Sequence, residues 1–378
     1  MIAVIWTDWY AYHIARLRAL SDHSMLRGKV LGIELVGGCG EHAGLRFRSD
    51  ERQGLPIETL MPQADWRTAG QGRVGVELWR KLRTANPAMV LVPGYYTVPA
   101  LMAAMWAKLH RRHSVLMSET TREDHSRVWW KESAKRWIVR LLFDSAIAGG
   151  KPHVRYLREL GVRPETIRRG YDVVDNHFFA GEADRMRASE SRAALGLPED
   201  YFLFVGRFSP EKNVEQLVRS FAEFRGAGGR SHLVLCGDGP LRDTLARMAE
   251  ELGVSECVHF EGMKSVRELP PYYAFARCLV LPSTREPWGL VINEAMASGL
   301  PVLASSRCGS VEDLVEDEVN GFVFDPRECG ALTAAMLRVA RLNERRIAEM
   351  GQRSREIIAR YSPEIWASEV AHLASQCI

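Results

Sequence analysis

The sequence predicts an α/β protein with two doubly wound domains, and three observations favour this fold class. The chain has 378 residues, which suits two domains at about 150 residues each. Its 46% hydrophobic and 26% charged residues are ordinary for a globular protein and exclude a disordered, collagen-like or disulfide-scaffold chain. Short β-rich runs alternate with helical patterns along both halves, which is typical of parallel sheets covered by helices on both faces.

The first half contains five β-rich runs, with helical patterns between several of them. The expected strands are Ile2–Trp6, Val30–Val36, Met89–Val92, Ser114–Met117 and Ser145–Ala148. The expected helices are His13–Leu20, Gly75–Arg83, Pro99–His110 and Trp129–Phe143. Residues 84–107 carry no charge, but Pro93, Gly94 and Pro99 interrupt them, so this segment predicts a strand, a turn and a helix rather than a membrane span.

The second half repeats this alternation. The expected strands are Tyr201–Val205, His232–Cys236, Cys257–Phe260, Cys278–Leu281, Pro301–Ala304 and Gly321–Phe324. One helix is expected to begin at Pro210, and the others are Leu241–Leu252, Leu290–Ser298, Ala331–Leu342, Glu344–Arg360 and Glu364–Ser375. The polar segment Val173–Asp200, with Gly181 and Pro198 as breakers, marks the boundary between domains at residues 1–175 and 176–360. Ligands of such sheets bind at the carboxyl ends of the strands, so we expect functional residues in the loops that follow them.

The net charge of +3 conceals two halves of opposite sign. Residues 1–180 contain 27 Lys and Arg against 18 Asp and Glu, a net charge of +9, whereas residues 181–378 contain 23 against 29, a net charge of −6. The basic half predicts an acidic partner, such as a phosphorylated substrate or an anionic membrane surface. It shows none of the usual nucleic-acid-binding motifs, so no nucleic acid partner is expected.

The cysteines and the first residues indicate a cytoplasmic protein. Seven cysteines have no CxxC spacing, which predicts reduced thiols and no zinc site. The chain opens with MIAVIW, which lacks a basic segment and a cleavage site, so we expect no signal peptide.

The first candidate site is the segment Gly206–Lys212 (GRFSPEK), which follows a predicted strand. Ser209 is a favourable N-cap and Pro210 suits the first helical position, so a helix is expected to begin here. Its N–H groups and the positive end of its dipole would favour an anion. Arg207 and Lys212 flank this terminus and suit a diphosphate, although an ordinary capped surface helix explains the same residues equally well.

The second candidate site is Glu286–Glu294 (EPWGLVINE). Gly289 would let a ligand approach the backbone where the next helix begins. The N–H groups that could bind phosphate or sugar oxygens are those of Gly289, Leu290 and Val291. The two terminal glutamates could accept hydrogen bonds from sugar or ribose hydroxyls. The alternative is two solvent-facing acids, but the apolar run that follows predicts a buried helix in which Glu294 needs a partner.

A third candidate is the tight turn Gly237–Pro240, which follows the strand His232–Cys236. It could approach a nucleotide, but such turns are common and alone indicate little.

Four segments in this order resemble the retaining glycosyltransferases of family 4, also called glycosyl transferases group 1: GRFSPEK, LVLCGDGP, EPWGLVINEAMASGLPVLAS and NGFVF. The resemblance extends over about residues 202–324, and EPWGLVINE resembles that family's pair of glutamates separated by seven residues. It implies the GT-B fold, with two Rossmann-like domains facing each other across a cleft. Residues 361–378 resemble the family's terminal helix, which crosses back onto the first domain.

The resemblance implies a role for each matching residue. Arg207 and Lys212 would neutralise the donor's diphosphate and Glu286 would contact the donor sugar, so these three are the expected catalytic residues. Glu294 would bind the ribose hydroxyls. The other expected donor-binding residues are Gly206, Gly237, Asp238, Met263, Gly289, Leu290 and Val291.

The implied activity is transfer of a hexosyl unit from a nucleotide-diphosphate-sugar, with retention of the anomeric configuration. A UDP-sugar is the favoured donor, and the acceptor is a saccharide, a lipid or a small molecule that the sequence does not identify. The family works without a metal, so no metal or other cofactor is expected. The alternatives are a GT-B-fold nucleotide-sugar epimerase, a phosphorylase, and a non-catalytic nucleotide-sugar-binding protein.

The first half departs from the family's pattern in two loops. The first loop, WTDWYAYH, has no glycine where many members have a glycine-rich loop, and MSET stands where a histidine is common. Asp8, His13 and Glu119 occupy these loops and are the acceptor-side candidates. His13 is explained equally well as a histidine at a helix start, and Glu119 as a partner of Arg122.

The segment Gly38–Ala43 (GCGEHA) fits the GxGxxA pattern of a dinucleotide-binding loop. That pattern needs a helix to open at the loop, and the residues that follow show no apolar stripe. An NAD site is therefore not expected.

The segment Trp129–Phe143 has the pattern of a basic amphipathic helix. One face carries Trp130, Ala134, Trp137, Ile138 and Leu141, and Lys131, Lys135, Arg136 and Arg140 lie mostly opposite. Such a helix can lie on an anionic membrane, which would place the protein at the inner face of the membrane. We favour the simpler interpretation, in which the apolar face covers the core and the basic face is solvated.

Overall fold

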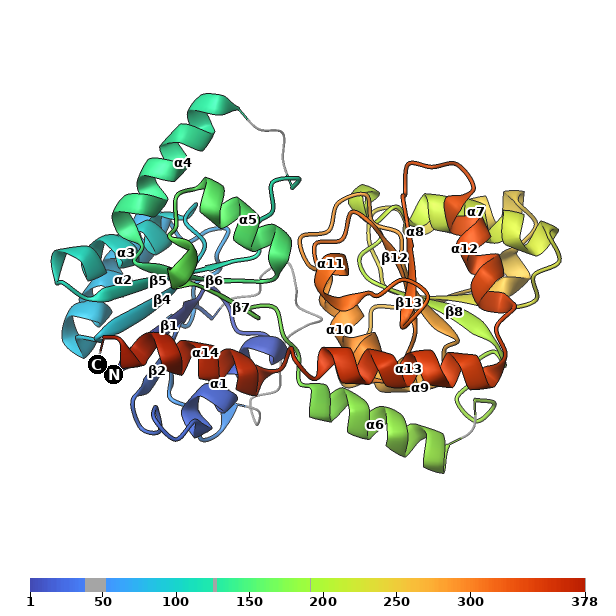
Figure 1. Cartoon of the computed structure of the whole chain (residues 1–378), viewed down its shortest axis with the longest axis horizontal. Coiled ribbons are helices and arrows are strands. Elements are labelled where there is room, and N and C mark those ends of the chain that lie inside the picture. The colour runs from blue at the N-terminus through green and yellow to red at the C-terminus, as the bar shows by residue number, and fades with distance from the viewer. Residues whose placement is uncertain (38–51, 125–127, 191, 378) are drawn as a thin grey trace. The chain divides into compact units, whose positions relative to one another are not determined.

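The computed structural model describes residues 1–37, 52–124, 128–190 and 192–377, which form two compact units (Figure 1). The first unit is Met1–Val174 together with Tyr361–Ile378, and the second is Asp175–Arg360. The polar segment expected to separate the domains is largely helical. Helix α6 (Asn176–Ser189) opens the second unit, and the Asp175 carboxylate caps it by accepting from Phe178 N at 2.9 Å.

The first unit is a seven-stranded sheet in which every pairing is parallel, in the order β3-β2-β1-β4-β5-β6-β7. Its strands are β1 (Ile2–Trp6), β2 (Val30–Val36), β3 (Ile57–Met61), β4 (Met89–Pro93), β5 (His113–Ser118), β6 (Ser145–Ala148) and β7 (Ile167–Arg169). Its helices are α1 (Ala11–Asp22), α2 (Gln71–Ala85), α3 (Val98–Leu109), α4 (Trp129–Leu142), α5 (Lys151–Glu159) and α14 (Pro363–Ser375). All the strands and helices predicted in this half are present. The uncharged segment is β4, a turn and α3, as expected.

Alternate residues of β1 enter two different cores. Ala3 and Ile5 pack on the face covered by α2 and α3. Val4 and Trp6 pack on the other face, against α1 and α14. A parallel strand buried on both faces is continuously apolar, which is why IAVIW was recognisable from the sequence.

The second unit is a six-stranded parallel sheet in the order β10-β9-β8-β11-β12-β13. Its strands are β8 (Tyr201–Val205), β9 (His232–Cys236), β10 (Val258–Gly262), β11 (Cys278–Leu281), β12 (Val302–Ser305) and β13 (Gly321–Phe324). Besides α6, its helices are α7 (Val214–Gly226), α8 (Arg242–Glu251), α9 (Pro270–Phe275), α10 (Leu290–Ala297), α11 (Val311–Leu314), α12 (Ala331–Ala340) and α13 (Glu344–Ile358).

The prediction that a helix begins at Pro210 is wrong. Pro210–Lys212 is a single 3₁₀ turn, and Asn213 interrupts it in the left-handed region at φ 57°. Helix α7 then begins at Val214. Ser209 caps neither segment, because its hydroxyl donates to the Glu211 carboxylate instead, at 2.6 Å.

The prediction for the apolar face of α4 is also wrong. That face does not cover the core: Trp130, Trp137 and Leu141 are exposed, and the buried residue of the helix is Val139, on the other side. No helix in the described ranges is long and apolar enough to cross a membrane.

The strand order of each sheet reverses once, between β1 and β4 in the first unit and between β8 and β11 in the second. In doubly wound sheets, ligands bind outside the carboxyl ends of the strands at such a reversal. The loops after β8 and β11 are therefore where a ligand of the second unit is expected.

Helix α14 completes the core of the first unit, although it follows the second unit in the chain. It packs beside α1 (Figure 1). Its Trp366 is fully buried among apolar residues of β1, β4 and β5. The neighbouring Ile365 is 44% exposed.

We expect Trp366→Ala to destabilise the first unit by about 3–5 kcal/mol, because it removes a buried aromatic ring and leaves a cavity. Ile365→Ala, one residue away on the same helix, should change the free energy of unfolding by less than about 0.5 kcal/mol. Urea unfolding of both variants, followed by tryptophan fluorescence and circular dichroism, measures the difference. Equal effects would show that α14 does not contribute to this core.

Candidate functional site

Two loops meet at the strand reversal of the second unit. The turn after β8 ends at Asn213, whose side-chain amide donates to the carbonyl of Pro282, just after β11, at 3.1 Å. On the same turn, the Glu211 carbonyl accepts from Thr284 N at 2.9 Å. These bonds fix the two loops against each other.

Lys212 and Glu286 form an ion pair between these loops. The Lys212 ammonium donates to Glu286 Oε2, and the Ser283 hydroxyl donates to the same oxygen at 3.2 Å. The Glu286 carboxylate is buried, so its charge needs such partners. The structure thus brings together two of the three expected catalytic residues.

The loop that carries Glu286 is also held by the loop that follows β12. Glu286 N donates to the Arg307 carbonyl at 3.4 Å, and Gly309 N donates to the Glu286 carbonyl at 2.9 Å. Cys308 lies between these two residues. Burial, followed by the nearby Glu286 carboxylate, raises the pKa of the Cys308 thiol well above its usual range. Cys308 is therefore a neutral packing residue and not a thiolate nucleophile.

Gly289 makes the sharp entry into α10. Its φ of 88° lies in the left-handed region, and a Cβ there would come within 3.2 Å of Glu286 Cγ and 3.0 Å of Leu281 Cδ2. The first turn of α10, with Leu290 and Val291, therefore starts directly beside the Glu286 side chain. The first N–H groups of a helix have no acceptor within the helix, which suits phosphate or sugar oxygens.

Glu294 is fully buried within α10 and has a protein partner. The hydroxyl of Tyr273, on α9, donates to Glu294 Oε2 at 2.5 Å. Sequence reasoning recognised that this buried carboxylate needs a partner but missed Tyr273, which lies 21 residues away without a motif of its own. The ribose-binding role of Glu294 stays a prediction.

The loops after β8 and β9 pack against each other through glycine. Gly206 N donates to the Cys236 carbonyl at 3.0 Å, and Phe208 N donates to the Asp238 carbonyl at 2.8 Å. A Cβ on Gly237 would lie 1.9 Å from the Gly206 carbonyl oxygen. Glycine at position 237 is thus required by packing, whether or not a ligand approaches it.

The remaining predicted donor-side residues lie at the same edge of the sheet. Arg207 and Asp238 are exposed in the loops after β8 and β9. Met263 is exposed directly after β10. Because every strand of this sheet is parallel, the carboxyl ends of all six meet at one edge. The structure therefore places all the predicted donor-side residues at or next to this edge.

A separate hollow of about 310 Å³ lies between α6, α9 and α13 of the second unit. Arg187 and Arg355, which line it, both pair with Asp184, at 3.1 and 2.6 Å. The predicted donor residues do not line this hollow. Its paired charges indicate a structural role.

In the first unit, Asp8 and His13 hold the loop after β1. Asp8 Oδ1 accepts from Trp9 N at 2.9 Å. The backbone nitrogen of Tyr10 and the carbonyl oxygen of Asp8 lie 3.2 and 3.1 Å from His13 Nδ1, and the His13 ring stacks on Trp6 with centroids 4.5 Å apart. These contacts favour the structural interpretation of His13, and its acceptor-side role stays a prediction.

Glu119 lies in a charged cluster that the sequence did not reveal. Arg122 Nη1 forms an ion pair with Glu159 Oε2 at 2.8 Å. Burial, followed by the neighbouring Glu119, raises the pKa of Asp172 well above its usual range, against an opposing effect of Arg16. The Asp172 carboxyl therefore tends to retain a proton.

Arg16 is the cation of this cluster. Its guanidinium is buried and lies 4.6 Å from the centroid of the Tyr171 ring, whose hydroxyl accepts from Trp6 Nε1 at 3.1 Å. The buried position of Arg16 was hard to predict from the sequence, because an arginine on an amphipathic helix is usually solvated.

No group of three or more His, Cys, Asp and Glu side chains that could hold a metal ion occurs in the part of the chain that the structure describes. Six cysteines, from Cys236 to Cys377, are free. The segment Gly38–Ala43, considered for NAD, lies outside the described residues.

Comparisons with known proteins give a family match for part of the chain and a match for its fold. Residues 188–357 match the family described as glycosyl transferases group 1. The structure of Anabaena HepE in complex with UDP and glucose superposes with a TM-score of 0.74, at 20% identity over all of both chains. The fold is accordingly that of the GT-B glycosyltransferases.

Two curated relatives come from Mycolicibacterium smegmatis. The D-inositol 3-phosphate glycosyltransferase is 37% identical over 222 residues, covering 56% of this chain and 47% of the relative. The GDP-mannose-dependent alpha-(1-6)-phosphatidylinositol monomannoside mannosyltransferase is 34% identical over 185 residues, covering 47% and 48%. The chain thus matches about half the length of these relatives.

We expect Gly237→Ala to destabilise the second unit by about 3 kcal/mol or more. The added Cβ would overlap the carbonyl oxygen of Gly206, and relieving that overlap requires the backbone of the β8 loop to move. Gly226→Ala, at the end of α7, is the matched control: a Cβ there meets nothing within 4 Å, and alanine favours the helix. Thermal and urea unfolding compare the two. A Gly237→Ala protein as stable as Gly226→Ala would contradict the close packing of the β8 and β9 loops.

His13 should make the first unit sensitive to acid. Burial, followed by the Arg16 charge, lowers the pKa of His13 well below 6.5, and its hydrogen bond to the Asp8 backbone opposes this only in part. Below about pH 6.5 the unfolded chain binds a proton that the folded protein does not, so stability falls as the pH drops toward the folded pKa.

His13→Gln should therefore lose less stability than the wild type between about pH 7.5 and pH 5.5, by at most about 1 kcal/mol per pH unit. His177→Gln, which replaces an exposed histidine on α6, should behave as the wild type. Urea titrations at both pH values measure this. An unchanged pH dependence in His13→Gln would refute the neutral state of this half-buried ring.

Proposed function

We propose that this protein is a retaining, metal-independent glycosyltransferase that moves a hexosyl unit from a nucleotide-diphosphate-sugar to an acceptor. The observation that carries this proposal is the meeting of Lys212 and Glu286 at the strand reversal of the second sheet, beside the first turn of α10. A cation, a carboxylate and helix N–H groups in one place match the two parts of such a donor, an anionic diphosphate and a polyhydroxylated ring.

The ion pair suggests how the donor would be received. A diphosphate would compete with Glu286 for the Lys212 ammonium, and its phosphate oxygens could also accept from the start of α10. The Glu286 carboxylate would then be released to accept hydrogen bonds from sugar hydroxyls. Arg207, exposed at the same edge, would supply a second positive charge.

These cations would act on the leaving group. As the glycosidic bond breaks, negative charge grows on the diphosphate, and preorganised donors aimed at that charge lower the barrier. We propose attack on the face from which the diphosphate leaves, with a donor phosphate oxygen taking the acceptor's proton. This needs no covalent intermediate on the protein and no metal ion.

The base of the donor is proposed to be uridine, because HepE was solved with UDP and glucose. Guanosine is the competing base, because one curated relative is GDP-mannose-dependent. The basic half of the chain, with its net charge of +9, favours an anionic acceptor. The inositol 3-phosphate in the name of the other relative has that character.

A panel of UDP-, GDP- and ADP-sugars tested for thermal stabilisation should identify the donor, because a ligand that binds the folded state raises the melting temperature by mass action. The nucleotide-sugar that raises the melting temperature is then used in assays of sugar transfer and of slow donor hydrolysis, with and without EDTA. Proton NMR of the product reports the anomeric configuration. Inversion, or loss of activity with EDTA, would contradict the mechanism.

Lys212→Ala should reduce turnover with that donor about 100-fold to 1000-fold, the usual effect of removing a group that stabilises developing negative charge. Arg345→Ala, which removes an exposed cation on α13, is the matched control and should stay within about twofold of the wild type. Near-normal turnover in folded Lys212→Ala would refute the proposed role.

A further inference from the structure

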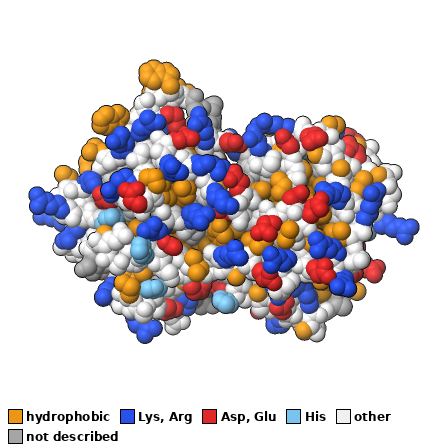
Figure 2. Space-filling view, viewed as in Figure 1, with side chains coloured by type: hydrophobic (Ala, Val, Ile, Leu, Met, Phe, Trp, Pro, Cys, Tyr) orange, Lys and Arg blue, Asp and Glu red, His pale blue; other side chains and the backbone are white. Residues whose placement is uncertain are grey.

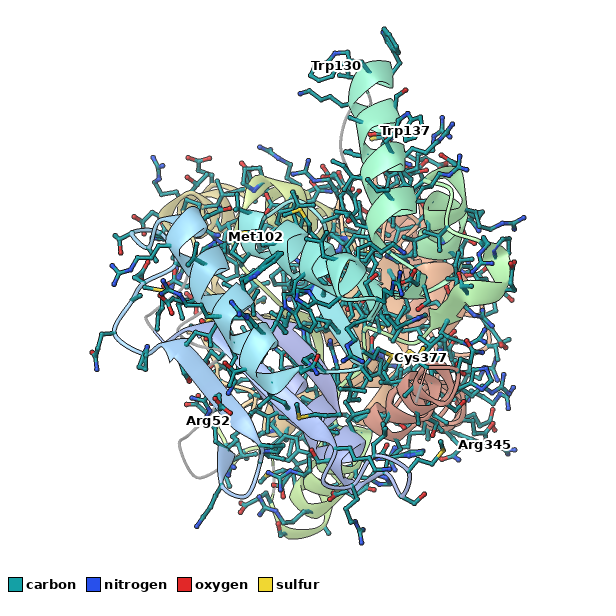
Figure 3. All side chains as sticks on the ribbon, turned by 90° about the vertical axis from the view of Figure 1, so that its left-hand side faces the viewer. Arg52, Met102, Trp130, Trp137, Arg345 and Cys377 are labelled. Carbon is teal, nitrogen blue, oxygen red and sulfur yellow. The ribbon has the colours of Figure 1, made fainter. Side chains whose placement is uncertain are left out.

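Helix α4 presents large apolar side chains to solvent. Trp129 is 80% exposed, Trp130 55%, Trp137 77% and Leu141 65%. Figure 3 shows α4 projecting from the first unit, with Trp130 and Trp137 along its projecting part. In the space-filling view, hydrophobic side chains gather at this end of the molecule, with Lys and Arg side chains beside them (Figure 2). Exposed tryptophan is uncommon unless a surface contacts an apolar partner.

The exposed side chains form one stripe. Residues 130, 134, 137 and 141 are four, three and four positions apart, which places them on one line along a helix. We call Trp130, Ala134, Trp137 and Leu141 the apolar stripe of α4. Trp129 lies beside it in the first turn.

Contacts on the opposite face fix the orientation of the stripe. Val139 is buried in the core. Glu132 accepts from the hydroxyl of Tyr156, on α5, at 2.8 Å and pairs with Lys135 at 2.7 Å. Arg136 Nε donates to the Glu159 carbonyl at 3.0 Å. The stripe therefore faces solvent because of how the helix is anchored. Turning it inward would expose Val139 and break the contacts of Glu132 with Tyr156 and of Arg136 with Glu159.

Cations border the stripe on both sides. At 100° per residue, Lys131 lies on one side of it and Arg140 lies on the other. The Lys131 ammonium is 5.4 Å from the Trp130 ring centroid. Helix α4 contains four basic residues and one acidic residue, Glu132. The Glu132 side chain points toward α5, where it accepts a hydrogen bond from Tyr156.

We propose that α4 lies in the interface of an anionic membrane, with its apolar stripe at the boundary between headgroups and acyl chains. Tryptophan favours that depth, because its ring is apolar and its N–H can still find a polar partner. Lys131 and Arg140 would reach the lipid phosphates while their methylene stems lie along apolar surface. The 14 residues of α4 span about 21 Å, too short to cross the hydrocarbon core, so the helix lies along the surface.

A second copy of the chain is a poorer occupant of the stripe. A two-fold contact between two α4 helices would bring the same cations together from both sides, and like charges at an interface oppose association. Anionic lipid complements both the apolar stripe and its basic borders. This inference does not depend on the proposed activity, because its test measures binding alone.

Co-sedimentation with sucrose-loaded vesicles tests the proposal. The wild-type protein should bind vesicles of equal phosphatidylcholine and phosphatidylglycerol, and bind phosphatidylcholine vesicles at least tenfold more weakly. About 0.5 M NaCl should weaken binding to the anionic vesicles, because salt screens the attraction. Failure of the wild type to bind the anionic vesicles at low salt would overturn the proposal.

Variants separate the stripe from its borders. The double change Trp130→Ser with Trp137→Ser, and separately Lys131→Glu with Arg140→Glu, should each lower the partition coefficient at least tenfold. Leu252→Ser, at the end of α8, and Arg83→Glu, on α2, replace an exposed apolar and an exposed basic residue elsewhere and should stay within twofold of the wild type.

Circular dichroism and melting temperature confirm that each variant is folded, and sedimentation velocity without lipid reports self-association. Folded stripe variants that bind as the wild type does would overturn the proposal. A wild-type dimer that the stripe variants dissociate, with no vesicle binding in either protein, would assign the stripe to a second copy and would also overturn it.

Discussion

Every strand pairing described in both sheets is parallel, and the rest of the molecule follows from that constraint. A parallel strand cannot return by a hairpin, so each connection must cross over the sheet, usually as a helix. Successive strands then end at the same edge, and the loops that leave this edge are the ones free to carry chemistry. Residues far apart in sequence, such as Lys212 and Glu286, become neighbours because each follows a strand beside the reversal of strand order.

The buried parallel strands were also the part of the fold most readable from the sequence. Strands such as Ile2–Trp6, Tyr201–Val205 and Cys278–Leu281 are apolar on both faces and were predicted with their observed bounds. By contrast, β3 is a half-buried edge strand, and β7 has three residues, two of them arginine. Neither has an apolar run, so tertiary pairing rather than local pattern determines them.

The site was predictable where a motif stands in one loop and unpredictable where packing decides. EPWGLVINE gave Glu286, Gly289 and α10, because a glycine in the left-handed region leaves a recognisable pattern. The partner of Glu294 could not be read, since Tyr273 reaches it only after α9 folds against α10. The expected helix at Pro210 failed because Asn213 takes a left-handed conformation, which local propensity does not require. The face that α4 buries was likewise decided by Glu132, Tyr156 and Val139 and not by the apolar pattern.

The return of α14 to the first unit has a consequence for the order of events during synthesis. The chain emerges from the ribosome with most of the first unit first, then the whole of the second, and only then Trp366 and its helix. Until α14 arrives, the groove beside α1 is an open apolar surface, with Val4, Trp6 and Leu17 lacking their last cover. The core of the first unit therefore stays incomplete until α14 is synthesised, whereas all residues of the second unit are already available to fold.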